Sequence, residues 1–195
     1  MVTVTVPEDD GDDEEPDAPA DAVVRESHKM QSLLASIGET MGFRIWLPKQ
    51  DRGPVLTDWT PATPDALLNT LPLNYDEATL KTIEQIDVLW LKGRSIARAF
   101  EVEHTTAVYS GILRMADLLA LQPNMDIRLH IVAPEARKEK VFTEIRRPVF
   151  TLLDRGPLYE QCTFLSYDSL RALSGHQHLE YMSDRVLEEY AEEAE

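Results

Sequence analysis

The stretch QIDVLWLKGRSIARAFEVEHTT, from Gln85 to Thr106, decides the fold. It contains two apolar runs, Ile86–Leu91 and Ala97–Val102, separated by a short segment of lysine, glycine, arginine and serine. Two apolar runs of this length with a glycine-containing turn between them are typical of a β-hairpin. We therefore expect two neighbouring strands here, with Lys92–Ser95 as the turn that joins them.

Three acidic residues lie in or beside these runs: Asp87 in the first, and Glu101 and Glu103 at the end of the second. Because successive strand residues point to opposite faces, Glu101 and Glu103 share one face and His104 points to the other. A hairpin turn allows Asp87 to lie on the same face as the two glutamates. Burying an unpaired carboxylate costs on the order of several kcal/mol, so three of them on adjacent strands indicate a shared role.

A divalent cation is the simplest such role, because it converts repulsion among carboxylates into coordination. We predict a Mg²⁺ site, with Mn²⁺ as a substitute ion, in which Asp87, Glu101 and Glu103 are both the metal ligands and the catalytic residues. A metal in such a site activates water and neutralises charge on a scissile phosphate. The alternative is a solvated sheet face whose acids pair with basic residues of the hairpin. The strongly apolar helix predicted to follow argues against it, because that helix has to pack on the sheet.

Hydrophobic periodicity and turn residues divide the rest of the chain into elements. Predicted helices cover residues 26–41, 65–69, 76–82, 107–121, 135–144, 167–173 and 179–193. Further predicted strands cover residues 43–47, 127–132 and 161–166, and the proline-containing segment 49–79 is expected to form a long loop. The order helix, strand, strand, strand, helix, strand predicts an α/β fold, with one mixed sheet and helices on both faces.

The composition predicts one domain and an acidic tail. Residues 1–25 carry nine acidic residues and one arginine, so we expect them to be a disordered N-terminal segment. Residues 26–195 then form the domain, with a core at about 26–134 and a C-terminal elaboration at 135–195. A formal net charge of −16 excludes binding to nucleic acid by bulk charge, although a metal-dependent nuclease needs only local base around its site.

The sequence also bounds the cellular setting. The single cysteine, Cys162, excludes an internal disulfide and a cysteine-based zinc site, and we expect it to be inert. The chain has no apolar run of membrane-spanning length and no signal-peptide pattern at its start. We expect a cytoplasmic protein with no membrane partner.

Asp87, followed on the next strand by Glu101-Val102-Glu103, resembles the motif of the restriction-endonuclease-like, or PD-(D/E)xK, nuclease superfamily. The resemblance covers residues 26–134 and includes the α-β-β-β-α-β core that this superfamily shares. Asp87 takes the place of the motif Asp and Glu101 that of (D/E), while Glu103 stands where the motif has lysine, as in a Glu-x-Glu variant. The run FEVEHTT to YSGILRMADLLALQP also resembles bacterial restriction-type or defence-associated proteins that are often joined to other domains.

This resemblance implies a Mg²⁺-dependent DNA endonuclease that hydrolyses phosphodiester bonds in a restriction or defence system. DNA is the implied partner, together with other domains or subunits of such a system, and a homodimer is left open. Because Glu103 replaces the lysine, a catalytically inactive nuclease-fold module that binds DNA or protein remains the alternative. A third hypothesis is an RNA or nucleotide phosphohydrolase that uses the same kind of metal site.

Candidate residues outside the triad are few. Glu39, on the first helix, is either an additional ligand or a solvated helix position. The basic residues that would contact a phosphate backbone are Lys49, Arg52, Lys92, Arg94, Arg137, Lys138, Lys140, Arg146 and Arg147. The alternative for these residues is a solvated face.

Overall fold

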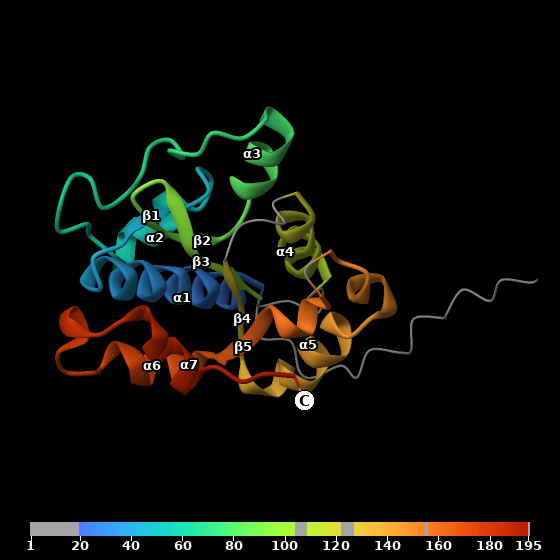
Figure 1. The fold of residues 1–195 in the computed structure, drawn as a ribbon. Helices are drawn as coiled ribbons and strands as arrows, with labels where there is room; N and C mark the ends of the chain where they lie inside the picture. The colour runs from blue at the N-terminus through green and yellow to red at the C-terminus, as the bar shows by residue number, and fades with distance from the viewer. Residues whose placement is uncertain (1–19, 104–108, 122–126, 155, 195) are drawn as a thin grey trace, which may run out of the picture.

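A computed structural model describes residues 20–103, 109–121, 127–154 and 156–194 (Figure 1). The strands are β1 (Arg44–Trp46), β2 (Val88–Lys92), β3 (Ser95–Val102), β4 (Arg128–Ala133) and β5 (Cys162–Ser166). The α-helices are α1 (Ala20–Thr40), α2 (Arg52–Asp58), α3 (Glu77–Ile83), α4 (Tyr109–Leu121), α5 (Lys138–Ile145), α6 (Tyr167–Ser174) and α7 (Leu187–Tyr190). Short 3₁₀ helices occupy Glu135–Arg137, Pro148–Thr151, Leu158–Glu160, Leu179–Tyr181 and Asp184–Val186.

The strands form one mixed sheet in the order β1-β2-β3-β4-β5. The β1/β2 and β2/β3 pairs are antiparallel, whereas β3/β4 and β4/β5 are parallel and are connected by crossovers that contain helices. Lys92 pairs with Ser95 around Gly93, whose φ of 63° is the left-handed conformation that a tight hairpin turn requires. The predicted hairpin is therefore confirmed, and β3 lies at the centre of the sheet.

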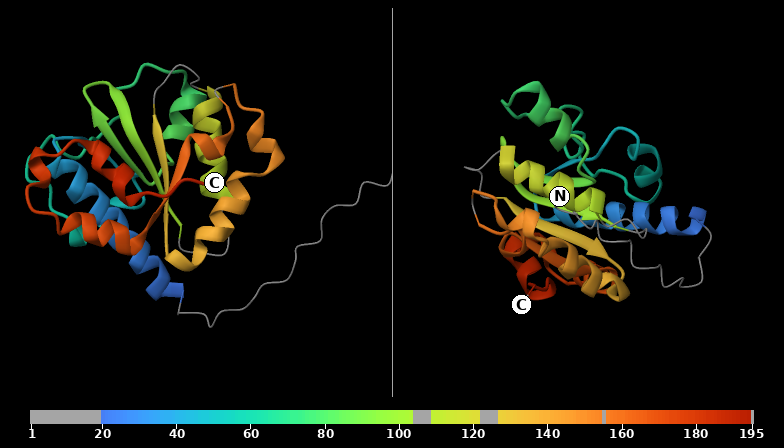
Figure 2. Two further views of the ribbon diagram at one scale, coloured as in Figure 1. Left: turned by 60° about the horizontal axis from the view of Figure 1, so that its bottom comes forward. Right: turned by 90° about the vertical axis from the view of Figure 1, so that its right-hand side faces the viewer.

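Helices cover both faces of this sheet, as the left view of Figure 2 shows. One buried cluster joins the sheet to α3, α4 and α5 through residues such as Ala99 and Ile112. The other joins it to α1, α2, α6 and α7 through residues such as Phe100 and Leu34. Because Ala99 and Phe100 are consecutive in β3, the two clusters use the alternate faces of one strand. The predicted α/β fold is confirmed.

Helix α1 lies directly against the hairpin. A Cβ built at Gly38 would overlap the Trp90 indole, and the Trp90 Nε1 donates a hydrogen bond of 3.0 Å to the Leu34 carbonyl. The helix ends before Gly42, whose φ of 84° suits the predicted glycine stop. Even α1, at 21 residues, is not apolar enough to cross a membrane, and the same is true of every helix in the described part of the chain.

The helix predicted at residues 65–69 is wrong. Ile45 exchanges backbone hydrogen bonds with Ala66 and Leu68, so this segment runs as an extended partner of β1. The helix in this region is α2 instead, where Pro54 occupies the first turn and removes an N–H group that has no partner inside the helix. The helix predicted at residues 76–82 is present as α3, and Asp76 caps it, because its carboxylate accepts from the N–H groups of Ala78 and Thr79.

The continuous C-terminal helix predicted at residues 179–193 is also wrong. The segment breaks after Tyr181, Ser183 caps a new turn, and the chain becomes extended beyond Tyr190. Glu192 then pairs with Phe164 on the edge of the sheet in an antiparallel bridge. Backbone pairing at an exposed strand edge therefore prevails over local helix propensity here.

Candidate active site

The hairpin brings the three predicted acids to the carboxyl end of β3. Val88 pairs with Phe100, so Asp87 lies opposite Glu101 across the two antiparallel strands. The Asp87 carboxylate accepts a hydrogen bond of 2.8 Å from the Val102 backbone N–H. The Glu103 backbone N–H donates to the Val132 carbonyl at 2.8 Å and so continues the pairing of β3 with β4. Backbone contacts therefore hold all three residues in place.

This acidic face of the sheet is covered rather than solvated. Glu101 has no exposed surface and Glu103 is 7% exposed. The N-terminal end of α4 lies on both, since a Cβ built at Gly111 would overlap the Glu103 Oε1 atom and lie 3.2 Å from the Glu101 Cβ. Only a glycine allows the helix to approach so closely, and the solvated-face alternative is wrong for these two residues.

A cation that we did not predict from the sequence, Arg114 of α4, completes the site. Its guanidinium holds both carboxylate oxygens of Glu101: the Nε donates to Oε1 at 2.8 Å and the Nη2 donates to Oε2. The Arg114 side chain is 30% exposed, so the ion pair reaches the protein surface. The sequence contains a signal for it: Arg114 lies three residues after Gly111, which places the two on the same helical face.

The site is electrostatically strained. Burial and the nearby Asp87 carboxylate raise the pKa of Glu101 well above its ordinary value, and the ion pair with Arg114 opposes this shift. Burial and Asp87 likewise raise the pKa of Glu103 to about 7, against the opposing effects of Arg114 and a backbone hydrogen bond from Gly111. The hydrogen bond with Glu101 raises the pKa of Arg114. Three carboxylates thus share one guanidinium, which leaves an excess of negative charge.

Other elements support the rim of the site. The Tyr167 hydroxyl of α6 donates a hydrogen bond of 3.0 Å to the Glu103 carbonyl, and burial raises the pKa of this hydroxyl. Asp51, which precedes α2, lies 3.9 Å from the Nε2 of His28 in α1. Burial raises the pKa of Asp51, while His28 and Arg114 oppose that shift. The segment before α2 therefore lies close enough to interact electrostatically with Arg114.

The donor chemistry of Asp87, Glu101 and Glu103 suits a divalent metal, because all three provide carboxylate oxygens from a rigid sheet. The positions of the three side chains, however, do not form a metal site in this structure. Among the residues that the structure describes, no three histidine, cysteine, aspartate or glutamate side chains are grouped closely enough to hold a metal ion. Arg114 already donates to both oxygens of Glu101, so its guanidinium and a metal would use the same two atoms.

Comparison with known proteins identifies the family. Residues 5–194 match the family described as the Type II restriction enzyme NmeDI C-terminal domain. The chain belongs to this family. It is 33% identical over 138 residues to the Type II restriction enzyme NmeDI of Neisseria meningitidis serogroup C, a match that covers 68% of this chain and 39% of that protein. The chain therefore spans about two fifths of the length of this relative. No solved structure matches the chain.

Two further residues of this chain have structural roles. Glu39 accepts hydrogen bonds from the Trp59 indole at 3.0 Å and from the Ala62 N–H at 2.7 Å. It therefore anchors the loop after α2 and is neither a ligand nor a solvated residue. Cys162 is buried in β5, and burial raises the pKa of its thiol to about 12, in agreement with the prediction of an inert residue. His104 lies outside the described residues.

Several of the predicted phosphate-binding residues also stabilise the fold. Arg52 donates to the carbonyls of Leu47 and Leu68 and stacks on the Trp46 ring, so it connects the loop to β1. Lys138 pairs with Glu135 and Glu192 at the C-terminal segment. Arg147 also pairs with Glu144, at 2.8 Å, and its guanidinium lies over the Tyr109 ring at 5.3 Å, at the start of α4.

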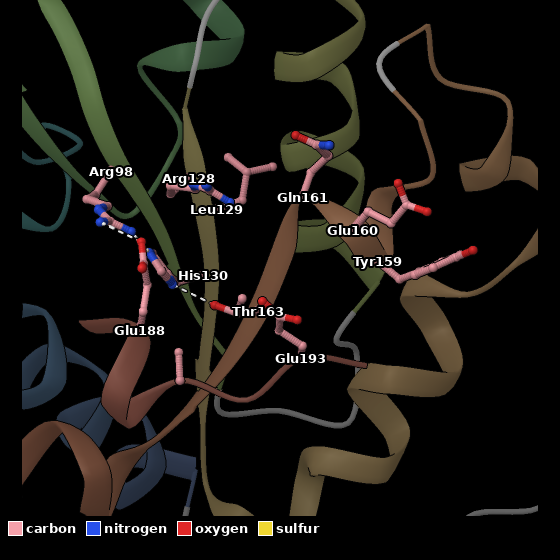
Figure 3. Close-up of a pocket in the computed structure, with 11 residues that line it drawn as sticks. Arg98, Arg128, Leu129, His130, Tyr159, Glu160, Gln161, Thr163, Glu188 and Glu193 are labelled. Carbon is pink, nitrogen blue, oxygen red and sulfur yellow. Dashed lines mark hydrogen bonds and ion pairs between the residues drawn. The ribbon is translucent and has the colours of Figure 1, made fainter. Parts of the chain in front are cut away.

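One cavity, of about 260 Å³, lies toward the start of β3 (Figure 3). Arg98, His130 and Thr163 line it, together with acidic residues of the C-terminal segment. Arg98 is directed toward Glu188, and the His130 ring toward the Thr163 hydroxyl. None of the three predicted acids lines this cavity, so it is separate from the candidate active site.

Proposed function

We propose that this chain is the metal-dependent DNA-cleaving domain of a restriction enzyme, with Asp87, Glu101 and Glu103 as its active-site carboxylates. The observation that carries the proposal is that the three acids of the sequence motif lie at the end of β3, where α4 covers Glu101 and Glu103 and Arg114 pairs with Glu101. Membership of the NmeDI C-terminal family supports the proposal, because the named relative is a type II restriction enzyme.

In this proposal the three carboxylates hold Mg²⁺ or Mn²⁺, which supplies a Lewis acid that activates water and neutralises charge on the phosphodiester. The chain fixes the carboxylates before substrate arrives. The Val102 N–H orients Asp87, the pairing with β4 sets the position of Glu103, and Gly111 allows α4 to exclude water from Glu101. A dry and preorganised site strengthens every charge interaction within it.

DNA would approach along the start of α4. Arg147 and Tyr109 lie together there, and Tyr109 is two residues before the Gly111 that contacts Glu103. A guanidinium at this position suits a phosphate next to the cleaved bond. Since the chain matches 39% of its relative, we also propose that it acts together with a further part of a longer protein.

The test is cleavage of plasmid DNA by the purified protein with Mg²⁺ or Mn²⁺. The wild type should nick or cut the DNA, and Glu101→Ala should lose at least about a hundredfold in rate, because removing an active-site electrostatic group has effects of this order. Glu139→Ala is the matched control, since Glu139 is exposed on α5. Equal cleavage by the wild type and Glu101→Ala would contradict the assignment of Glu101 as an active-site carboxylate.

The second candidate is an inactive nuclease-fold module that binds DNA or protein. The observation that favours it is the Glu101–Arg114 pair, which gives the buried carboxylate a cation from within the chain. If the module is inactive, calorimetry should detect no Mn²⁺ binding that depends on Asp87. DNA binding without cleavage under the same conditions would support this candidate over the nuclease.

A further inference from the structure

We propose that Arg114 and the divalent cation compete for the carboxylate of Glu101, so that Arg114 is a positioning residue that metal binding releases toward the DNA phosphate. The inference rests on the proposed nuclease function and deepens it. It assigns a role to a residue that lies outside the acidic motif.

The first observation is that Arg114 uses the oxygens that a metal needs. Two guanidinium nitrogens donate to the two oxygens of Glu101, so Arg114 already engages both atoms that a metal would use. Because Glu101 has no exposed surface, any replacement of Arg114 by a metal ion at this carboxylate has to occur inside the protein. Two cations on one buried carboxylate repel each other strongly, because the interior screens charge weakly.

The second observation is that Arg114 is able to leave. Its side chain is 30% exposed and reaches Glu101 from the surface of α4. Within the described residues, its hydrogen bonds go to Glu101 alone. The buried Arg98, by contrast, is 3% exposed and contacts Asp184, Glu188 and His130, so it has no comparable path to solvent.

The third observation is the balance of charge. Asp87, Glu101 and Glu103 bring three carboxyl groups to the end of β3, and the hydrogen bonds of Arg114 engage the oxygens of Glu101, so the cluster has further carboxyl oxygens for a second cation. A divalent ion would satisfy the carboxylates without Arg114. The guanidinium, which binds phosphate oxygens in pairs, would then be free beside the substrate. This supplies the cation that position 103 lacks, since the motif lysine is replaced there by glutamate.

The experiment is Mn²⁺ titration calorimetry on the wild type, Arg114→Gln and Arg114→Lys, with Arg185→Gln as a control, since Arg185 is exposed in the C-terminal segment. Removal of the competing guanidinium should tighten Mn²⁺ binding on the order of tenfold in Arg114→Gln, because a buried carboxylate left without its partner binds another cation more strongly. Arg114→Lys, which loses the two-point contact, should tighten it severalfold. Arg185→Gln should match the wild type.

Two further readouts separate positioning from a merely structural role. Mn²⁺ should raise the melting temperature of Arg114→Gln more than that of the wild type, since a ligand stabilises the state that binds it. With saturating Mn²⁺, Arg114→Gln should cleave DNA with a lower kcat despite its tighter metal binding. If Arg114→Gln does not fold, the folded Arg114→Lys variant has to show the severalfold tightening.

The outcomes distinguish this inference from the proposed function. If the wild type binds Mn²⁺ in a manner that depends on Asp87, but neither Arg114 variant binds it more tightly, competition is wrong and the nuclease assignment stands. If no variant shows Asp87-dependent binding, the proposed function fails and the inference fails with it.

Discussion

The two ends of β3 hold buried charge in opposite ways. Near its start, Arg98 donates to the Asp184 carboxylate at 2.7 Å and to the Asp184 carbonyl at 3.2 Å, and it also pairs with Glu188. Near its end, on the other face, Glu101 has Arg114 as its hydrogen-bonded cation among several carboxylates. In the first group both carboxylates contact Arg98 directly, whereas in the second three carboxyl groups, of which Glu101 and Glu103 are buried, lie near one guanidinium.

This difference is the one expected between a structural network and the metal site that we propose. Arg98 fastens the C-terminal segment to the sheet, because its partners lie 86 and 90 residues further along the chain. The acidic cluster is costly to the isolated fold, since burial raises the pKa of both of its glutamates. Strain of this kind is expected where a protein reserves a site for a ligand.

Removal of Arg98 should therefore have the largest effect on stability. Arg98→Met should lower the free energy of unfolding by about 3 kcal/mol, because breaking a buried ion pair costs roughly that amount. Urea denaturation at neutral pH measures the loss, with Arg137→Met as the control. A loss as small as that of the control would show that the two ends of β3 do not differ as described.

Removal of charge from the acidic cluster should act in the opposite direction. Glu103 has a pKa of about 7 in the folded protein against an ordinary value of 4.5, so its ionisation opposes folding as the pH rises through this interval. Glu103→Gln should then stabilise the metal-free protein at pH 8, by up to about 3 kcal/mol at 1.36 kcal/mol per pKa unit. Below pH 4.5 the two proteins should be equally stable. Denaturation curves across pH 4–8 test this prediction. A Glu103→Gln variant that is less stable than the wild type at pH 8 would contradict the claim that ionised Glu103 destabilises the fold.

His130 gives the Arg98 network its own pH dependence. Burial, together with Arg98 and Arg128, lowers the pKa of His130 from 6.5 to about 3. The neutral ring fits its contacts, since Nε2 accepts from Arg98 at 3.5 Å and Nδ1 donates to Thr163 at 2.7 Å. The unfolded state binds the extra proton, so stability is lost as the pH falls from 6.5 towards 3.

The variant His130→Gln isolates this contribution. It should be less stable than the wild type by about 1–2 kcal/mol at pH 7, through lost hydrogen bonds. At pH 4 the difference in stability between the two proteins should be smaller, because the wild type loses stability on acidification and the glutamine variant, which cannot bind this proton, does not. A gap that stays constant with pH would show that His130 titrates normally.

The smallest expected effect is on DNA affinity. Arg147→Gln should weaken DNA binding severalfold and reduce the slope of log affinity against log salt by about one, which is typical for loss of one phosphate contact. Fluorescence anisotropy in Ca²⁺ at several salt concentrations measures both quantities. Arg185→Gln is the matched control, because Arg185 is exposed and is not among the predicted phosphate contacts, and an unchanged slope in Arg147→Gln would place the DNA elsewhere.

The sequence could predict the acidic cluster because the positions of its residues follow from local structure. Strand alternation and a tight turn at Gly93 are enough to place Asp87 beside Glu101, and the apolar pattern of residues 107–121 requires a helix over that face. Arg114 was missed because a charged residue on an amphipathic helix ordinarily faces water. Only the packing of Gly111 on Glu103 turns it inward.

The C-terminal segment could not be predicted for the converse reason. Its composition favours one helix over residues 179–193, but the interactions that break it come from distant residues. Arg98 holds Asp184, and the edge of β5 pairs with Glu192. Such contacts leave no periodic signal in the segment itself, so tertiary structure overrides local propensity.

The most direct test of the central claim is a crystal structure grown with Mn²⁺ and measured at the manganese absorption edge. We expect an anomalous peak bound by Asp87 and Glu101, with the Arg114 guanidinium turned away from Glu101. Arg98 should remain paired with Asp184. A structure without such a peak, in which Arg114 still holds both oxygens of Glu101, would contradict the account.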